Sequence, residues 1–157
     1  MKLTQIGEIR SPFNDSKGTP IQPTYSTANG EVILNDEYVE GLTSLDGFSH
    51  MILLYWCHKT KDFDLLAAPY LDDRKHGIFS IRAPSRPNPI GLSVVRILEI
   101  RNNRILFEGV DILDGTPLLD IKPYVPEFDA RPEASSGWLT ERFSAEEHKI
   151  ADRRFQS

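Results

Sequence analysis

The chain has 157 residues with a net charge of −5, and this length favours one domain around one hydrophobic core. Hydrophobic residues make up 39% of the sequence, and no apolar run reaches the ~20 residues of a membrane-spanning helix, so we expect a globular, cytoplasmic protein. The single cysteine, Cys57, excludes an intrachain disulfide and zinc sites built from cysteine clusters, and we expect no metal. The N-terminus also lacks the apolar run of a signal peptide.

The charge is unevenly distributed. Residues 70–98 hold five Lys or Arg and two acidic residues, a net charge of +3 that leaves −8 for the rest of the chain. A negative total argues against general nucleic-acid binding. A basic patch can still attract phosphate groups locally, although ordinary scatter of surface charge explains the pattern equally well.

The first half of the chain predicts three strands, over 3–9, 31–34 and 50–57. The third is apolar throughout and rich in aromatic residues, which favours a buried strand. Residues 14–29 are rich in Ser, Thr, Asn, Gly and Pro and predict a long loop. Asp36 can cap a short helix that ends at Gly41.

The second half predicts a polar connection over 61–75 and strands over 76–81, 91–100, 104–110 and 118–121. Asn102 and Asn103 separate two of these strands and indicate a tight hairpin, because asparagine tolerates positive φ. Residues 144–147 have the pattern of a capping box, which predicts a C-terminal helix through Arg154.

About seven short strands without a regular strand–helix alternation indicate a mainly β fold, a single antiparallel β-barrel with one or two short helices, including the C-terminal one. We expect the one domain to span 1–157, with 130–157 as a tail and helix.

Two segments, 82–93 and 111–124, combine charged residues with five of the eleven prolines. Three of these prolines, Pro84, Pro87 and Pro89, fall within six positions, which excludes a helix or a central strand there. A stiff loop holds its charges in place, as a binding site for a small polar ligand requires.

Taken singly, these residues leave alternatives open. Residues 114–117 form an ordinary turn or a turn that binds a ligand. Asp120 and Lys122 share one strand face, as an exposed salt bridge or as site residues. Arg82 and Arg86 are solvated loop charges or bidentate partners of a carboxylate or phosphate.

Taken together, several motifs resemble the TrmO family (also called the YaeB or TsaA-like family) of tRNA methyltransferases. The resemblance covers roughly residues 3–125 and rests on IGEIRSPF (6–13), ANGE (28–31), LDGFSH (45–50), GIF (77–79), Arg82 with SRPNPIGLS (85–93), and DGTP (114–117) with DIKPY (120–124). All of them in this order are far more specific than any one alone.

The resemblance implies a homodimeric, S-adenosyl-L-methionine-dependent enzyme on a β-barrel. The implied substrate is tRNA, methylated at N6 of the threonylcarbamoylated adenosine beside the anticodon. Carried over by motif, the implied cofactor contacts are Pro20, Ile21, Gln22, His58, Lys59, Arg82, Leu92, Leu113, Asp114, Gly115 and Thr116.

The resemblance and the charge pattern together suggest roles for the remaining motif residues. Arg82 is expected to hold the methionine carboxylate and Asp114 the ammonium or ribose. The expected tRNA contacts are Lys75, Arg86, Asn88 and Lys122. Threonylcarbamoylation makes the N6 proton more acidic, so a strong base is not required; a side-chain base is expected first at Asp120 and second at Tyr124.

Two departures from the family pattern stand out. Ile21 occupies a position where relatives can carry arginine, and the extra C-terminal domain of bacterial relatives is here reduced to one helix. Three other functions remain open: a methyltransferase acting on another RNA or a small molecule, a non-catalytic RNA-binding barrel, and a regulator that senses the cofactor.

Overall fold

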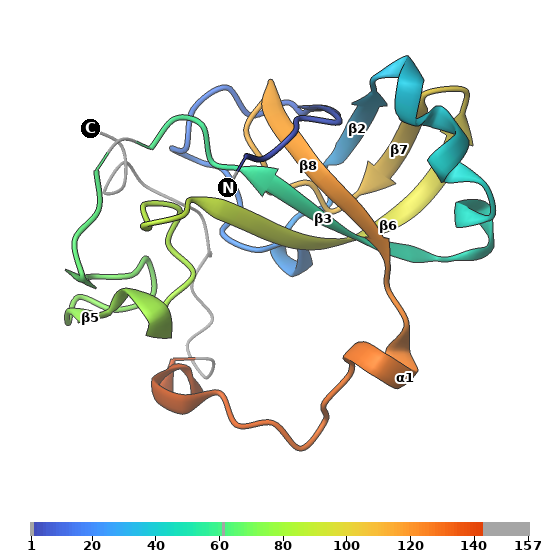
Figure 1. Cartoon of the computed structure of the whole chain (residues 1–157). Coiled ribbons are helices and arrows are strands. Elements are labelled where there is room, and N and C mark those ends of the chain that lie inside the picture. Colours follow the sequence, from blue (N-terminus) through green and yellow to red (C-terminus); the bar gives the residue numbers. More distant parts are fainter. Residues whose placement is uncertain (1, 61, 143–157) are drawn as a thin grey trace.

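The computed structural model describes residues 2–60 and 62–142, and its centre is a closed antiparallel barrel of strands in the order β1, β2, β7, β6, β3, β8 (Figure 1). The strands are β1 (Gly7–Arg10), β2 (Asn29–Leu34), β3 (His50–Trp56), β6 (Ile90–Arg101), β7 (Arg104–Glu108) and β8 (Thr116–Pro123). The sequence prediction of a mainly β protein built on an antiparallel barrel is thereby confirmed.

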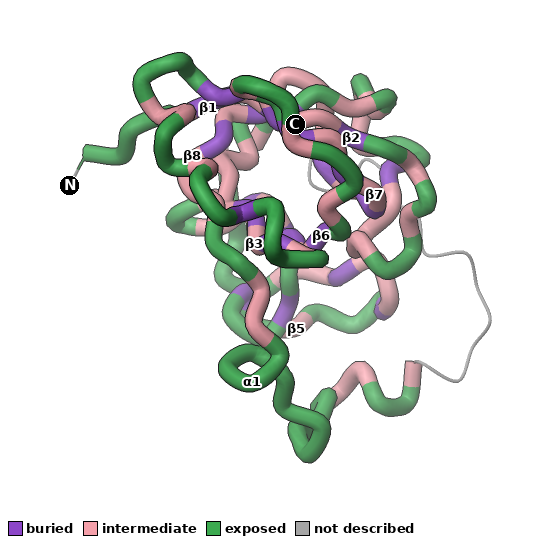
Figure 2. Tube along the Cα trace, turned by 90° about the vertical axis from the view of Figure 1, so that its right-hand side faces the viewer, coloured by how far each residue is buried: buried purple, intermediate pink, exposed green. Residues whose placement is uncertain are grey.

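The barrel interior is filled by alternate side chains of every strand, as the period of two in a β-strand requires. In β2, for example, Val32 and Leu34 are buried while Glu31 and Ile33 are partly exposed. The core consists of Ile9, Val32, Leu34, Leu45, Met51, Leu53, Val95, Ile105, Phe107, Val110, Ile112 and Leu118. In Figure 2 buried stretches, drawn in purple, occur along the barrel strands, whereas the chain around α1 is mostly exposed.

The β6–β7 hairpin turns where the sequence predicted it. Asn102 has a φ of 53°, the left-handed conformation that asparagine tolerates at a tight turn. A bulge between Ile97 and Glu99 shifts the register of β6 against β7. Bulges of this kind increase local twist and help a sheet to close into a barrel.

Other elements differ from the expectation. The first strand begins at Gly7, not Leu3, because only there does the chain pair with both β2 and β8. The expected strand over 76–81 is a two-residue strand, β5 (His76–Gly77), followed by the 3-10 helix η4 (Ile78–Ser80). The short helix after Asn35 is also 3-10, η2 (Asp36–Leu42), and further 3-10 turns are η1 (Pro23–Tyr25) and η3 (Leu45–Gly47). The predicted helix over 144–154 lies outside the described residues.

A side segment, residues 62–89, lies next to the barrel and contains β4 (Leu66–Ala67), β5 and η4. Its small core of Ile78, Ile81 and Ala83 is separate from the barrel core. Figure 1 shows the chain after β8 passing through α1 (Pro126–Asp129) and then below the barrel to the side of β5. We call residues 126–142 the C-terminal strap.

The strap is attached to the side segment by its last described turn, η5 (Gly137–Glu141). The Trp138 indole stacks on His76 with ring centroids 4.2 Å apart and donates from Nε1 to the Ser80 carbonyl at 2.9 Å. Arg142 Nη2 lies 2.9 Å from the buried Asp72 carboxylate. No helix in the described part of the chain is long and apolar enough to cross a membrane.

Candidate functional site

A cavity of about 450 Å³ opens between one end of the barrel and the side segment. This volume lies within the range of about 300–1,000 Å³ that is usual for small-molecule sites. Its walls come from the loop before η1, from the end of β3, from the proline-rich loop with the start of β6, and from the turn before β8. The two segments that the sequence singled out therefore meet here.

Most residues predicted to contact a cofactor line this cavity. They are Pro20, Ile21, Gln22, His58, Lys59, Arg82, Leu92, Leu113 and Thr116. Asp114 and Gly115, predicted with them, are not among the lining residues. The roles of all these residues remain predictions.

Arg82 and Gln22, sixty positions apart in sequence, meet at the cavity wall. Arg82 Nη1 donates to Gln22 Oε1 at 2.9 Å, and the arginine remains exposed. The guanidinium therefore keeps donors available for an anionic group, and a carboxylate can be bound by two parallel hydrogen bonds.

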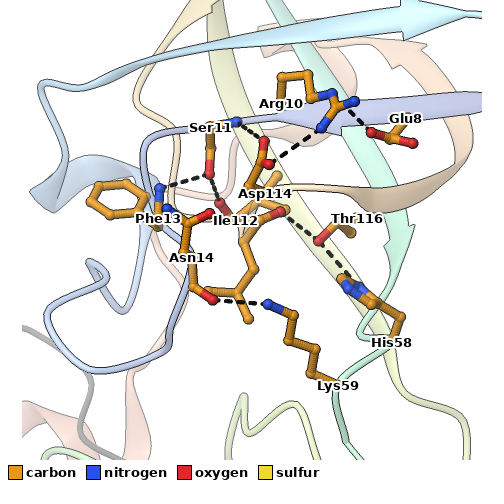
Figure 3. A network of polar contacts seen from close by, with 11 residues as sticks. Glu8, Arg10, Ser11, Phe13, Asn14, His58, Lys59, Ile112, Asp114 and Thr116 are labelled. Carbon is orange, nitrogen blue, oxygen red and sulfur yellow. Dashed lines mark hydrogen bonds and ion pairs between the residues drawn. The ribbon is translucent and has the colours of Figure 1, made fainter.

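The Asp114 side chain is held by contacts with Arg10 and Ser11, at the end of β1 (Figure 3). Its Oδ1 accepts from the Ser11 amide at 3.0 Å, and its Oδ2 lies 3.3 Å from Arg10 Nη1. Gly115 has a φ of 74°, which favours glycine at this position, and its amide donates to the Ile9 carbonyl at 2.9 Å. These contacts fix the turn against β1, and the predicted contact of Asp114 with a cofactor stays a prediction.

The same network reaches the cavity through Thr116 and His58 (Figure 3). Thr116 Oγ1 donates to the Leu113 carbonyl at 2.7 Å and lies 3.5 Å from His58 Nδ1. Burial, followed by the nearby positive charge of Lys59, lowers the pKa of His58. The Lys59 ammonium itself donates to the Asn14 carbonyl at 2.8 Å.

Asp111 lines the cavity, although no role was predicted for it within the segment 111–124. Ser93 Oγ donates to its Oδ1 at 2.7 Å, and the Tyr55 hydroxyl lies 3.0 Å from the same serine oxygen. Burial raises the pKa of Asp111 to about 7, against the opposing effects of the Ser93 hydrogen bond, its own backbone amide and the positive charge of Arg82. Its position just before the motif 113–117 was visible in the sequence, but its burial was not.

Of the predicted RNA contacts, Arg86 lines the cavity, whereas Lys75, Asn88 and Lys122 do not. Arg86 Nη1 donates to the carbonyls of Ile78 and Ile81 at 3.1 and 2.7 Å, so one of its roles is to fix the cavity wall. Its guanidinium carbon lies 6.0 Å from the centre of the Phe79 ring, which is 78% exposed at the cavity margin.

The predicted bases, Asp120 and Tyr124, are also not cavity-lining residues. Asp120 Oδ2 forms an ion pair with Lys122 Nζ at 2.8 Å, and the Asp120 side chain is 42% exposed. The Tyr124 ring lies edge-on to His50 with centroids 6.3 Å apart. The exposed salt bridge is the simpler of the two alternatives that the sequence left open for 120 and 122.

Comparison with known proteins places this geometry in a family. The family model described as "tRNA-methyltransferase O N-terminal domain" matches residues 8–130. A probable S-adenosyl-L-methionine-binding protein of Pyrococcus abyssi is 50% identical over 97% of this chain and 83% of its own length. The tRNA (adenine(37)-N6)-methyltransferase of Escherichia coli is 37% identical over 92% of this chain and 66% of its own length.

A solved structure agrees with these sequence matches. The crystal structure of TrmO from Pseudomonas aeruginosa superposes with a TM-score of 0.75 at 39% identity, over 87% of this chain and 61% of that one. This chain thus spans about three fifths of the solved protein. The match of the family model over most of the barrel shows that this chain belongs to the TrmO family through the N-terminal domain of that family.

Proposed function

We propose that the protein is an S-adenosyl-L-methionine-dependent methyltransferase that methylates N6 of threonylcarbamoyladenosine next to the anticodon of tRNA. The observation that carries this proposal is a cavity of small-molecule size, inside the residues matched by the family, with an exposed arginine at its wall and a partly buried carboxyl among its lining residues. The names of the Pyrococcus abyssi and Escherichia coli relatives support the cofactor and the reaction.

The residues present fit this cofactor. S-adenosyl-L-methionine carries a carboxylate, an ammonium and a sulfonium, so its site needs charges of both signs close together. Arg82 suits the carboxylate, and the apolar side chains of Ile81, Ile112 and Leu113 suit the uncharged parts. When bound, the cofactor supplies an activated methyl group.

The task of the chain in this reaction is alignment. Positioned reactants gain several kcal/mol from proximity alone. Arg86 and the exposed ring of Phe79 lie at the margin of the cavity, where a cation and a stacking surface suit an extruded base. We keep Asp120 and Tyr124 as proposed bases, and Lys75, Asn88 and Lys122 as proposed tRNA contacts, beyond the cavity.

The test is methylation of matched tRNAs. The purified protein would be incubated with S-adenosyl-L-methionine and a tRNA that carries or lacks the threonylcarbamoyl group, and the nucleosides would be measured by mass spectrometry. We expect one added methyl on the modified nucleoside only. Arg82→Ala should lose both cofactor binding and methylation, whereas Asp36→Asn, an exposed change outside the cavity, should lose neither.

Other results would favour the remaining candidates. Methylation of an unmodified or different RNA would replace the substrate but retain the chemistry. Cofactor binding with no methylation of any RNA would favour a sensing role. RNA binding without cofactor binding would favour a non-catalytic barrel.

We also propose that the protein is a cytoplasmic homodimer. The support is apolar exposure on β6, where Ile90, Leu92 and Leu98 are 38%, 50% and 42% exposed. Ile90 and Leu92 also line the cavity, so a partner subunit that covers this face would border the site. Light scattering of the purified protein tests the dimer: a monomeric mass at micromolar concentration would contradict it.

A further inference from the structure

Asp111 is a partly buried carboxyl in the cavity wall, and the other charged residues of that wall, Lys59, Arg82 and Arg86, are basic. Among the described side chains, its hydrogen-bond donor is Ser93, which is 1% exposed and carries no charge. The Tyr55 hydroxyl extends this chain by one more hydrogen bond of 3.0 Å. Burial makes the ionised carboxylate costly, whereas the Ser93 hydroxyl, the backbone amide of Asp111 and the positive charge of Arg82 partly offset that cost. Asp111 is therefore poised between its charged and neutral forms.

The titratable groups that share the cavity have different protonation behaviour. Burial raises the pKa of Cys57 to about 12 and that of Tyr55 well above 10, so both stay neutral near pH 7. Lys59, Arg82 and Arg86 are the basic residues of the lining. His58, whose pKa is lowered, titrates below its ordinary value of about 6.5. Asp111 is thus the group expected to change charge close to neutral pH.

A ligand that fills the cavity removes the remaining water from this carboxyl. Desolvation alone would favour the neutral acid still further. A cation in contact with the carboxyl has the opposite effect, because the attraction between opposite charges is strong in a site without water. S-adenosyl-L-methionine carries two cationic groups, the sulfonium and the ammonium, and one anionic group, the carboxylate, which suits Arg82. The cationic groups therefore need an acidic partner in the site.

We propose that Asp111 is the counter-ion of a positively charged group of bound S-adenosyl-L-methionine, and that its carboxyl releases its proton to the solvent as the cofactor binds. In this step the O–H bond of the acid breaks, the proton passes to the buffer, and the carboxylate pairs with the cation. The inference rests on the proposed function for the identity of the ligand. The sequence prediction instead placed Asp114 at the ammonium or the ribose of the cofactor.

The size of the effect follows from the protonation of the free site. With a free pKa of about 7, roughly 0.9 of a proton is released per site at pH 6 and about half a proton at pH 7. Cofactor affinity rises with pH, because the competing proton is lost: we expect about 30-fold tighter binding at pH 8 than at pH 5.5.

The experiment is isothermal titration calorimetry with S-adenosyl-L-methionine in buffers of different ionisation enthalpy, which counts protons directly. Wild type is compared with Asp111→Asn, an isosteric amide that retains an acceptor for Ser93 but cannot ionise. We expect the proton release to vanish and affinity at pH 8 to fall by about 30-fold or more. His58→Gln removes the other group that titrates in this pH range and should retain most of the proton release, because the release comes from Asp111. Asp36→Asn, outside the cavity, should behave as wild type.

A second variant guards against a folding defect in Asp111→Asn. The Ser93 hydrogen bond lowers the pKa of Asp111, so Ser93→Ala should raise that pKa and move the midpoint of the affinity profile to higher pH. Thermal melts of each variant establish that the chain is folded. An unchanged midpoint in folded Ser93→Ala would count against the proposal.

Ligand analogues identify which cation is sensed. S-adenosyl-L-homocysteine retains the ammonium but has a neutral sulfur, and 5′-methylthioadenosine has neither charge. Release with S-adenosyl-L-methionine alone assigns the sulfonium, and release with both aminoacyl ligands assigns the ammonium. Three results would overturn the inference and leave the proposed function standing. They are proton release on binding of methylthioadenosine, no proton release with any ligand that binds, and equal proton release by wild type and Asp111→Asn. If none of the ligands bound, the proposed function itself would fail.

Discussion

Gly91, in the motif that follows the proline-rich loop, offers a sharp test of how the cavity is built. It is the register partner of Tyr55 across β3 and β6. A Cβ at this position would lie 2.7 Å from Tyr55 Cδ2 and closer still to Cε2 and Cζ. Because packed carbon atoms prefer about 3.5–4.0 Å, Gly91→Ala must displace the Tyr55 ring or separate the two strands.

The expected cost can be worked out from these contacts. Overpacking of this kind costs about 1–3 kcal/mol. Loss of the Tyr55–Ser93 hydrogen bond adds about 1 kcal/mol, and replacing glycine by alanine in a strand returns roughly 0.5–1 kcal/mol. We therefore expect Gly91→Ala to lower the free energy of unfolding by about 2 kcal/mol, measured by urea denaturation.

A double-mutant cycle then tests the cause. In a Tyr55→Val background the ring is absent, so Gly91→Ala should cost nothing or stabilise by about 0.5 kcal/mol. Gly77→Ala is the matched control, because nothing lies within 4 Å of its added Cβ. If Gly91→Ala cost as much in the Tyr55→Val background as in the wild type, the close approach of ring and strand would be refuted.

Three further predictions concern the strap and the cysteine. Trp138→Ala should lower the free energy of unfolding in the same urea assay by about 2 kcal/mol, because it removes the stack on His76 (about 1 kcal/mol) and the hydrogen bond to Ser80 (about 1 kcal/mol). Trp138→Phe keeps an aromatic ring but has no N–H donor, so it should cost about half as much. The pKa of Asp72 is lowered in the folded protein, above all by the hydrogen bond from the Arg74 amide, so ionised Asp72 stabilises the fold above its unfolded pKa of about 3.9. This stabilisation is lost as the pH falls through the lower pKa of the folded state. Asp72→Asn should therefore lose less stability in acid than the wild type, and an unchanged pH dependence of unfolding below about pH 4 would contradict this. Because burial raises the pKa of Cys57 to about 12, the folded protein should react with iodoacetamide at pH 8 far more slowly than the urea-unfolded chain, and equal rates would show that the thiol is not protected.

The barrel was largely readable from the sequence, because its strands carry strong local patterns. The apolar run that became β3 and the asparagine pair between β6 and β7 each specify an element without reference to the rest of the chain. The prediction failed at 76–81, where the apolar residues Ile78 and Ile81 pack in the side segment under a 3-10 turn. A short apolar pattern cannot distinguish that arrangement from a strand, because both bury some residues and expose their neighbours.

The site shows a different limit. Arg82 and Gln22 were identified by motif resemblance, and the structure brings them together. Local spacing could not reveal that Asp114 is directed to Arg10, or that Asp111, three residues earlier, is the carboxyl beside the cavity. Asp114 pairs with Arg10, 104 positions away, and Asp111 with Ser93, 18 positions away in β6. The protonation of a carboxyl therefore follows from the folded structure and not from its motif.

The attachment of the strap has a consequence for how the molecule opens. The barrel closes on itself by hydrogen bonds between strands, whereas the small core of the side segment is completed by Trp138 from the far end of the chain. Residues with few barrel contacts open in native-state hydrogen exchange at lower free energy than the global value. We expect two classes of amide, those of the barrel exchanging only by global unfolding and those of 76–83 exchanging together with the strap. One wall of the cavity would then belong to the less stable unit, so a ligand bound there would raise the protection of amides at the distant C-terminal end.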